Sequence, residues 1–196
     1  MKKSYIVIGI IIVIVIGIFM WFKGSYNQMV TRSESASSQW SNVENQYQRR
    51  LDLIPNLVNT VKGYAEHEQN TLTQVVEARA KATQMRVNFD QLDEKTIQKF
   101  NSMQGELSSA LSRLMAISEQ YPDLKANENF RDLQAQLEGT ENRIAVERRK
   151  FNEEVKSYNA YIRSFPKNFI AGMFGFTPKP YFEATAGAEK APEVKF

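Results

Sequence analysis

The sequence predicts an all-α protein, an antiparallel up-down-up-down four-helix bundle with an N-terminal transmembrane helix. Two observations support this fold class. An uncharged apolar stretch occupies residues 5–22, and beyond it apolar side chains recur at every third or fourth position. That spacing is typical of one face of an α-helix, and short turns between long helices place sequence neighbours antiparallel. We divide the chain into an anchor (1–24), a bundle (25–165), an aromatic tail with Gly and Pro (166–183) and a small, charged end that we expect to be disordered (184–196).

Composition argues against several classes of function. The chain has 196 residues, of which 42% are hydrophobic, and a formal net charge of +3. This length suits one domain with appendages. The sequence contains no cysteine, which excludes disulfides, thiolate nucleophiles and cysteine metal ligands. Acidic and basic residues are mixed along the helices instead of forming a basic face, so we expect no nucleic-acid partner.

Residues 5–22 are the predicted membrane anchor. They carry no charge, with Lys2 and Lys3 before them and Lys23 after them. At 1.5 Å per residue the stretch would be about 27 Å long, close to the roughly 30 Å hydrocarbon core of a bilayer. A cleaved signal peptide is the alternative, but residues 20–23 offer no small-residue cleavage site. We expect one uncleaved span that lies in the lipid bilayer.

The charges that flank this span predict its orientation. Lys2, Lys3 and the terminal amine outweigh Lys23 and Arg32 on the other side. Positive charge favours the cytoplasmic face of a membrane. We therefore expect a cytoplasmic N-terminus and an extracytoplasmic bundle.

The first bundle helix is predicted to continue from the span with little or no linker. The residues that recur at every third or fourth position of a helix form what we call its stripe. In this helix they are Tyr26, Val30, Ser33, Ser37, Trp40, Glu44, Tyr47 and Leu51. Pro55 follows, and a proline inside a helix removes one hydrogen bond and clashes with the preceding turn. We therefore predict that this helix ends within residues 51–55 and that the second helix spans about 56–88. The alternative is a reversal within residues 63–70, which would make the first helix longer than the second by roughly 30 Å.

Turn and cap signals delimit the remaining helices. Asp93 is a predicted N-cap of the third helix, Pro122 stops that helix, and Asn127 or Asn129 is predicted to cap the fourth. The fourth helix has the longest periodicity in the chain, and Pro166 ends it. Its stripe comprises Phe130, Leu133, Leu137, Ile144, Arg148, Phe151, Val155, Tyr158, Ile162 and Phe165.

The tail after this helix is rich in large apolar side chains. They are Phe169, Ile170, Met173, Phe174, Phe176, Tyr181 and Phe182. We favour the interpretation that the tail folds back over the end of the bundle. The alternative is an exposed apolar patch that serves self-association, a partner or a membrane.

The residues that catalysis or metal binding needs do not occur in recognisable groups. His67 is the only histidine, flanked by Glu66 and Glu68. A zinc peptidase helix needs two histidines one turn apart, and di-iron bundles need a Glu-x-x-His pair on each of two helices. No glycine-rich phosphate loop and no serine with a positioned base stands out. We therefore predict no enzyme and no catalytic, cofactor-binding or metal residues.

Four charged residues fall on stripe positions: Glu44, Glu68, Arg79 and Arg148. Because an unpaired charge in a helix seam is costly, we predict that these acids and arginines pair across helices and fix the register. The alternative is a polar groove for a ligand or peptide. The runs of basic residues at 49–50 and 148–150 are interpreted as solvated helix faces, and secondarily as contacts with acidic lipids.

Several short motifs resemble the LemA family of bacterial membrane proteins. They are Tyr26-Asn27-Gln28-Met29-Val30, Arg49-Arg50-Leu51-Asp52-Leu53-Ile54-Pro55-Asn56-Leu57-Val58, Glu119-Gln120-Tyr121-Pro122-Asp123-Leu124-Lys125-Ala126-Asn127, Thr140-Glu141-Asn142-Arg143-Ile144-Ala145, Phe151-Asn152 (where many relatives carry Tyr-Asn) and Phe165-Pro166. The resemblance covers residues 24–183. It implies an N-terminal membrane anchor and an antiparallel four-helix bundle, and it implies no enzymatic activity.

These observations together predict a non-catalytic, single-pass protein of the bacterial inner membrane. We expect a scaffold or adaptor of the cell envelope that works through protein–protein contacts. Its expected partners are further copies of the same chain and a membrane or envelope protein. The alternative function is a ligand- or peptide-sensing membrane module with a polar groove between helices.

Overall fold

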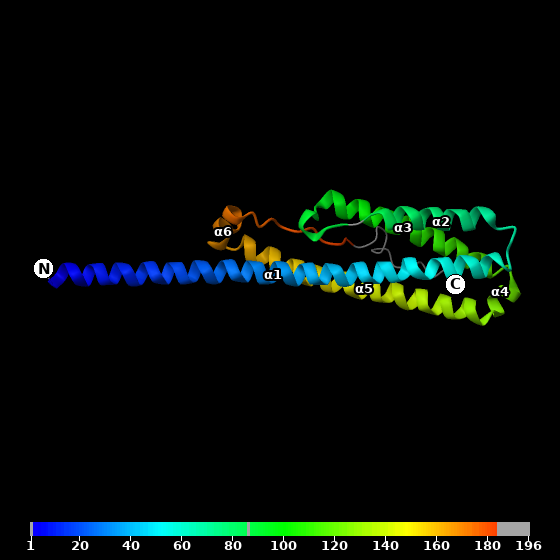
Figure 1. Cartoon of the computed structure of the whole chain (residues 1–196), viewed down its shortest axis with the longest axis horizontal. Helices are drawn as coiled ribbons and strands as arrows, with labels where there is room; N and C mark the ends of the chain where they lie inside the picture. The colour runs from blue at the N-terminus through cyan, green and yellow to red at the C-terminus, as the bar shows by residue number, and fades with distance from the viewer. Residues whose placement is uncertain (1, 86, 184–196) are drawn as a thin grey trace, which may run out of the picture.

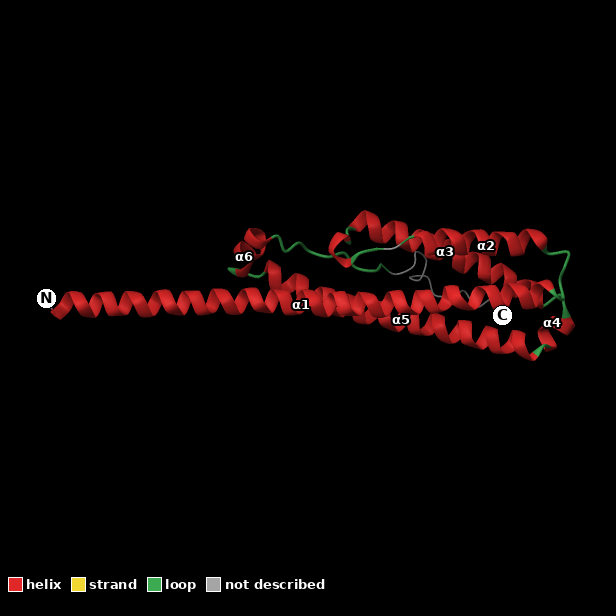
Figure 2. Cartoon of the chain, viewed as in Figure 1, coloured by secondary structure: helices red, strands yellow, loops and turns green. Residues whose placement is uncertain are grey.

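The computed structural model describes residues 2–85 and 87–183, with side chains described from residue 5 onward. The described residues form helices and no strand (Figure 2), which confirms the all-α fold class. The predicted disorder of residues 184–196 lies outside the described part. The elements are α1 (Lys2–Lys62), α2 (Gln69–Gln84), a short 3-10 helix η1 (Phe89–Gln91), α3 (Glu94–Ser118), α4 (Pro122–Ala126), α5 (Glu128–Arg163) and α6 (Lys167–Phe174).

Helix α1 is a single rod of 61 residues whose N-terminal part projects beyond the rest of the chain (Figure 1). The other long helices lie beside its C-terminal part, and the chain changes direction between α1 and α2, between α2 and α3, and before α5. Helix α1 packs mainly on α5 and to a smaller extent on α2, and α2 packs on α3. We call residues 25–183 the helical body.

Three apolar clusters follow one another along α1 inside the helical body. The cluster nearest the N-terminal rod contains Met29 of α1 with Tyr158 and Ile162 of α5. A middle cluster is built around Trp40, and a distal cluster extends from Leu51 to the end of α1. Burying large apolar side chains contributes about 1.5–3 kcal/mol each, so these clusters explain why the helices stay together.

The predicted break at Pro55 is wrong, because α1 continues through it to Lys62. The reversal lies between Lys62 and Gln69, within the alternative range. Pro55 is on the exposed side of the helix, whereas Ile54 and Leu57 beside it are fully buried. An interior proline costs about 3 kcal/mol, and burial of several apolar side chains on both sides of it outweighs that cost.

The predicted helix starts are confirmed at two positions. The Asp93 side chain accepts a hydrogen bond from the Thr96 amide at 2.7 Å, which caps α3. The Asn127 side chain accepts one from the Phe130 amide at 3.0 Å, so Asn127 is the cap of α5. Pro122 does more than stop α3, because it begins the short helix α4. Proline is well suited to the first turn of a helix, where its missing N–H has no partner to lose.

The first part of α1 is long and apolar enough to cross a membrane. It lies near the N-terminus, and none of its most apolar stretch is buried in the described structure. From Tyr5 to Met20 every large apolar side chain is more than half exposed. The core of this protein therefore does not use these residues.

The tail combines both predicted arrangements. Ile170, Ala171 and Phe182 are buried against the helical body. Phe169 and Met173 of α6 remain exposed. After α6 the chain turns at Gly175, whose φ of +75° favours glycine, and runs back along the helical body (Figure 1).

Candidate functional site

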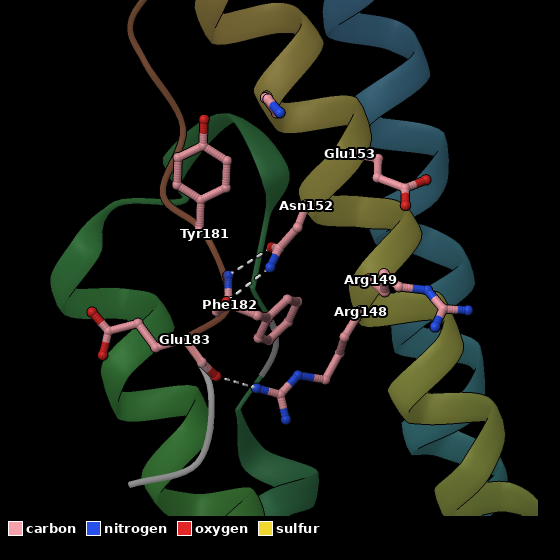
Figure 3. A pocket seen from close by; sticks show the side chains of 8 residues that line it. Arg148, Arg149, Asn152, Glu153, Tyr181, Phe182 and Glu183 are labelled. Atoms are coloured by element: carbon pink, nitrogen blue, oxygen red, sulfur yellow. Dashed lines mark hydrogen bonds between the residues drawn. The ribbon is translucent and has the colours of Figure 1, made fainter. Parts of the chain in front are cut away.

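Two asparagines of α5 hold the returning tail by its main chain. Asn159 donates to the Lys179 carbonyl at 2.8 Å and accepts from the Lys179 amide at 2.9 Å. Asn152 makes the same pair of bonds with Phe182, both at 2.8 Å (Figure 3). Seven residues of α-helix rise about 10.5 Å, and three residues of extended chain span about 10 Å. The spacing of the asparagines therefore matches the spacing of the tail residues that they bind.

Phe182 anchors the tail in the middle apolar cluster. Its ring stacks on Trp40 with centroids 5.7 Å apart and planes 14° apart, and it meets Phe151 edge to face at 5.4 Å. The Trp40 indole N–H donates to the Val87 carbonyl at 3.1 Å. Aromatic pairs at these distances stabilise beyond their buried area. One tail side chain thus connects α1, α5 and, through Trp40, the segment between α2 and α3.

Lys179 ties the tail to the 3-10 helix. Its ammonium group donates to the carbonyls of Phe89 and Asp90, both at 2.9 Å, and lies 4.9 Å from the centroid of the Phe89 ring. Burial lowers the pKa of Lys179, and the nearby Asp90 carboxylate opposes part of that shift. The carbonyl ligands explain how a charged group is accommodated here.

A shallow groove lies beside the docked tail (Figure 3). It has a volume of about 590 Å³ and is lined by Arg148, Arg149, Asn152, Glu153, Lys156, Tyr181, Phe182 and Glu183. Arg148 closes one side, because it donates to the Glu183 carbonyl at 2.9 Å and its guanidinium lies 4.6 Å from the centre of the Phe182 ring. The lining contains three basic side chains and two carboxylates, Glu153 and Glu183, so the groove carries a small net positive charge.

A buried arginine joins three helices near the middle of the helical body. Arg50 of α1 is 1% exposed and donates to Glu141 of α5 at 2.8 Å and to Ser108 of α3 at 2.9 Å. It also donates to the side chain of Gln104 and lies 5.1 Å from the Tyr47 ring centroid. Among the described residues its Nε has no hydrogen-bond partner. A polar groove of about 620 Å³ lies alongside and includes Arg148 in its lining.

The predicted pairing of the charged stripe residues is not what the described residues show. Arg79 donates to the Leu51 carbonyl at 2.9 Å, and Arg148 donates to the Glu183 carbonyl. Glu68 accepts from the Tyr121 hydroxyl at 3.4 Å. Partial burial raises the pKa of Glu44, as expected for a carboxyl that loses water. The two arginines therefore bind main-chain oxygens, and neither forms an ion pair with an acid among the described residues.

The interpretation of residues 49–50 as a solvated face is wrong for Arg50, whereas Arg49 is exposed. Residues 149–150 are exposed as predicted, and Arg148 is half-buried. His67 is exposed in the turn between α1 and α2. Over residues 2–85 and 87–183 no three His, Asp or Glu side chains are grouped so that they could hold a metal.

Sequence reasoning missed Arg50, Asn152, Asn159 and Lys179. A signal existed for Arg50, since Tyr47, Arg50 and Ile54 continue a 3-4 spacing on α1. The asparagines stand next to Phe151 and Tyr158 of the α5 stripe, one heptad apart. For Lys179 no local signal was available, because its partners lie about ninety residues earlier in the chain.

The exposed apolar start of α1 and the all-helical body fit a membrane-associated helical protein. Residues 39–196 match the sequence model of the LemA family, and the chain belongs to that family.

The curated relatives agree with this assignment. The magnetosome protein MamQ 2 of Paramagnetospirillum magneticum is 31% identical over 176 residues, which cover 81% of this chain and 64% of the relative. MamQ of Magnetospirillum gryphiswaldense is 30% identical over 180 residues, covering 83% and 66%. Protein LemA of Metamycoplasma hominis is 24% identical over 174 residues, covering 88% and 76%. The chain spans just under two thirds of the length of these MamQ relatives, and none of the three names describes an enzyme.

Proposed function

We propose that the protein is a non-catalytic, single-pass scaffold or adaptor of the bacterial inner membrane, built as an antiparallel four-helix bundle on a transmembrane helix. The observation that carries this proposal is the continuity of α1 from its apolar start into the core. Ser25 and Met29 are already buried in the helical body, so only residues 23–24 separate the body from the apolar stretch. A continuous helix transmits orientation, whereas a flexible linker does not.

A rigid joint of this kind suits a protein that presents surfaces at a fixed height above a bilayer. The distal end of the helical body would stand about 60 Å from the membrane, since about 40 residues of α1 follow Phe22. Relatives that carry magnetosome and LemA names, none of them an enzyme name, support a non-catalytic role. We propose that its contacts include further copies of the chain and a second membrane or envelope protein.

Crosslinking in native membranes tests the scaffold proposal. An amine-reactive crosslinker is applied before gentle solubilisation, and the products are separated by size and identified by mass spectrometry. We expect species larger than the 22.5 kDa chain, including homo-oligomers and one captured protein. A protein that stays strictly monomeric and captures no partner would contradict the proposal.

Orientation is tested separately with the exposed position Ser112 on α3. The chain has no native cysteine, so the Ser112→Cys variant carries a single thiol that a membrane-impermeant maleimide can label. Labelling of intact spheroplasts is expected if the bundle is extracytoplasmic, as the lysine distribution favours. Labelling only after lysis would place the helical body in the cytoplasm.

A sensory function is the second candidate, and the Arg50 groove is the observation that favours it. The groove combines a buried arginine, whose Nε is free among the described residues, with the half-buried Arg148. We rank it lower because Arg79 binds the Leu51 carbonyl and lines neither groove. Citrate as a tricarboxylate probe should raise the unfolding temperature of the intact protein in detergent if the groove binds acids. In the Arg148→Gln variant, which removes a cation from the groove lining, citrate should raise the unfolding temperature by less.

A further inference from the structure

Helix α6 carries an apolar face that nothing in the described structure covers. Phe165, just before α6, is 80% exposed, and Phe169 and Met173 are 65% and 71% exposed. Phe169 and Met173 are spaced four apart, so they share one side of the helix, and the Phe165 ring lies against Phe169 with centroids 6.0 Å apart. The other side is used for packing, with Ile170 and Ala171 buried against the helical body. The short helix is therefore fixed in place and apolar outward.

The position of α6 identifies the surface that this face meets. The Phe174 ring lies 5.8 Å from Phe22 and 4.9 Å from Tyr26. Phe22 is the last residue of the apolar stretch at 5–22, so α6 packs against α1 at the level where that stretch ends. Figure 1 shows α6 at the end of the helical body from which the N-terminal rod projects. The exposed face of α6 is thus beside an exposed apolar helix, at the level of a membrane interface.

The charges around α6 are of one sign. Residues 5–33 and 155–182 contain no aspartate or glutamate. Lys23 and Arg163 are exposed near α6, and the Lys167 ammonium lies 4.0 Å from the centre of the Tyr161 ring. Basic residues close to a membrane with anionic lipids are attracted to its negatively charged surface. An apolar face bordered by cations is typical of helices that lie in a lipid interface.

We propose that α6 is a second membrane contact of this protein, lying in the headgroup region with Phe165, Phe169 and Met173 toward the acyl chains. Lys23, Arg163 and Lys167 meet the phosphates of anionic lipids. This inference rests on the proposed membrane span. It adds a second attachment point, which fixes the rotation of the helical body about the α1 axis. The tail leads directly from α6 to Phe182 in the core. The hydrogen bonds of Asn152 and Asn159 to the tail main chain therefore connect this membrane contact to the helical body.

Fluorescence depth measurements on the full chain test the proposal. Met173→Cys, Ile12→Cys and Ala135→Cys variants are labelled with the fluorophore NBD and reconstituted into vesicles of phosphatidylcholine and phosphatidylglycerol. Some of the lipids carry spin labels, at a shallow or a deep position, that quench NBD. Ile12 reports on the span, and the exposed Ala135 lies toward the distal end of α5.

We expect shallow spin labels to quench NBD at position 173 at least roughly twofold more than NBD at position 135, and deep labels to quench NBD at position 12. Adding Phe169→Glu to Met173→Cys, or omitting phosphatidylglycerol, should reduce the quenching at 173. Circular dichroism checks that these variants stay helical.

Two results would overturn the inference while leaving the membrane span intact. One is quenching at position 12 with none at 173. The other is NBD emission at 173 that shifts to the blue only at high protein-to-lipid ratio, which would mean that a second copy covers α6. Absence of quenching at position 12 would instead contradict the proposed span itself.

Discussion

The Nε of Arg79 on α2 lies 2.9 Å from the carbonyl oxygen of Leu51 on α1. That carbonyl is the one that Pro55 leaves without a main-chain donor, because residue 55 of a regular helix would bond to residue 51. A guanidinium from the neighbouring helix supplies the missing hydrogen bond. This contact explains how α1 continues past a proline and why a charged side chain stands in the seam between α1 and α2.

Replacement of Arg79 should therefore destabilise the protein in a way that depends on Pro55. Arg79→Met leaves the Leu51 carbonyl unpaired, and we expect a loss of about 1–3 kcal/mol. A Pro55→Ala background restores a main-chain N–H at this position, which can donate to the Leu51 carbonyl, so the same replacement should cost less there. Thermal and denaturant unfolding of the full chain in detergent measures this double-mutant cycle.

The matched control is Lys81→Met on the same helix. Lys81 is exposed and forms a 3.3 Å ion pair with the exposed Glu106, which is worth little. Its replacement should change stability by no more than about 0.5 kcal/mol. Equal losses from Arg79→Met with and without Pro55 would show that Arg79 does not serve the Leu51 carbonyl.

Arg50 should not be replaceable by lysine. Its guanidinium reaches Ser108, Gln104 and Glu141 at once, and a single ammonium group cannot reproduce that geometry. We expect Arg50→Lys to lower the free energy of unfolding by roughly 1–3 kcal/mol. Arg49→Lys, next to it on the exposed face, is the control and should have little effect. Full stability of Arg50→Lys would mean that the buried network does not contribute.

Asn152 and Asn159, each of which makes two hydrogen bonds to the tail main chain, should act together in holding the tail on α5. Asn152→Ala or Asn159→Ala removes two hydrogen bonds and leaves buried main-chain groups unpaired, at a cost of about 1–3 kcal/mol each. Hydrogen exchange followed by mass spectrometry should show faster exchange at the Lys179 and Phe182 amides in both variants. The cost of the double variant should be smaller than the sum, because one released point already frees much of the tail.

Asn168→Ala provides the control for these variants. Asn168 is exposed at the start of α6, and no side-chain hydrogen bond of it is seen in the described structure. Exchange at Lys179 and Phe182 should be unchanged in this variant. Protection of Phe182 that survives Asn152→Ala would indicate that the aromatic contacts alone hold the tail.

Lys179 should make the stability of the folded protein increase with pH in the alkaline range. Burial lowers its pKa in the folded protein, so the folded state releases the proton before the unfolded state does. The contribution of Lys179 to the free energy of unfolding is therefore smallest at pH values below its pKa in the folded protein. It increases as the pH rises from that pKa toward the pKa of lysine in the unfolded chain. The unfolding temperature of the wild type should rise relative to that of Lys179→Met between pH 7 and about pH 10. A constant difference across this range would contradict the prediction.

The amino-acid sequence alone determined the helical class, the apolar N-terminal stretch, the stripe of α5 and the caps at Asp93 and Asn127. These features depend on residues within a few positions of one another, because helix periodicity and capping are local. The tertiary structure decided that α1 passes through Pro55, that Arg50 is buried and that Asn152 binds Phe182. In each case the deciding partner is 28 or more residues away along the chain. A missing or buried hydrogen bond is satisfied by whatever group the folded chain brings beside it, and only the packed structure shows which group that is.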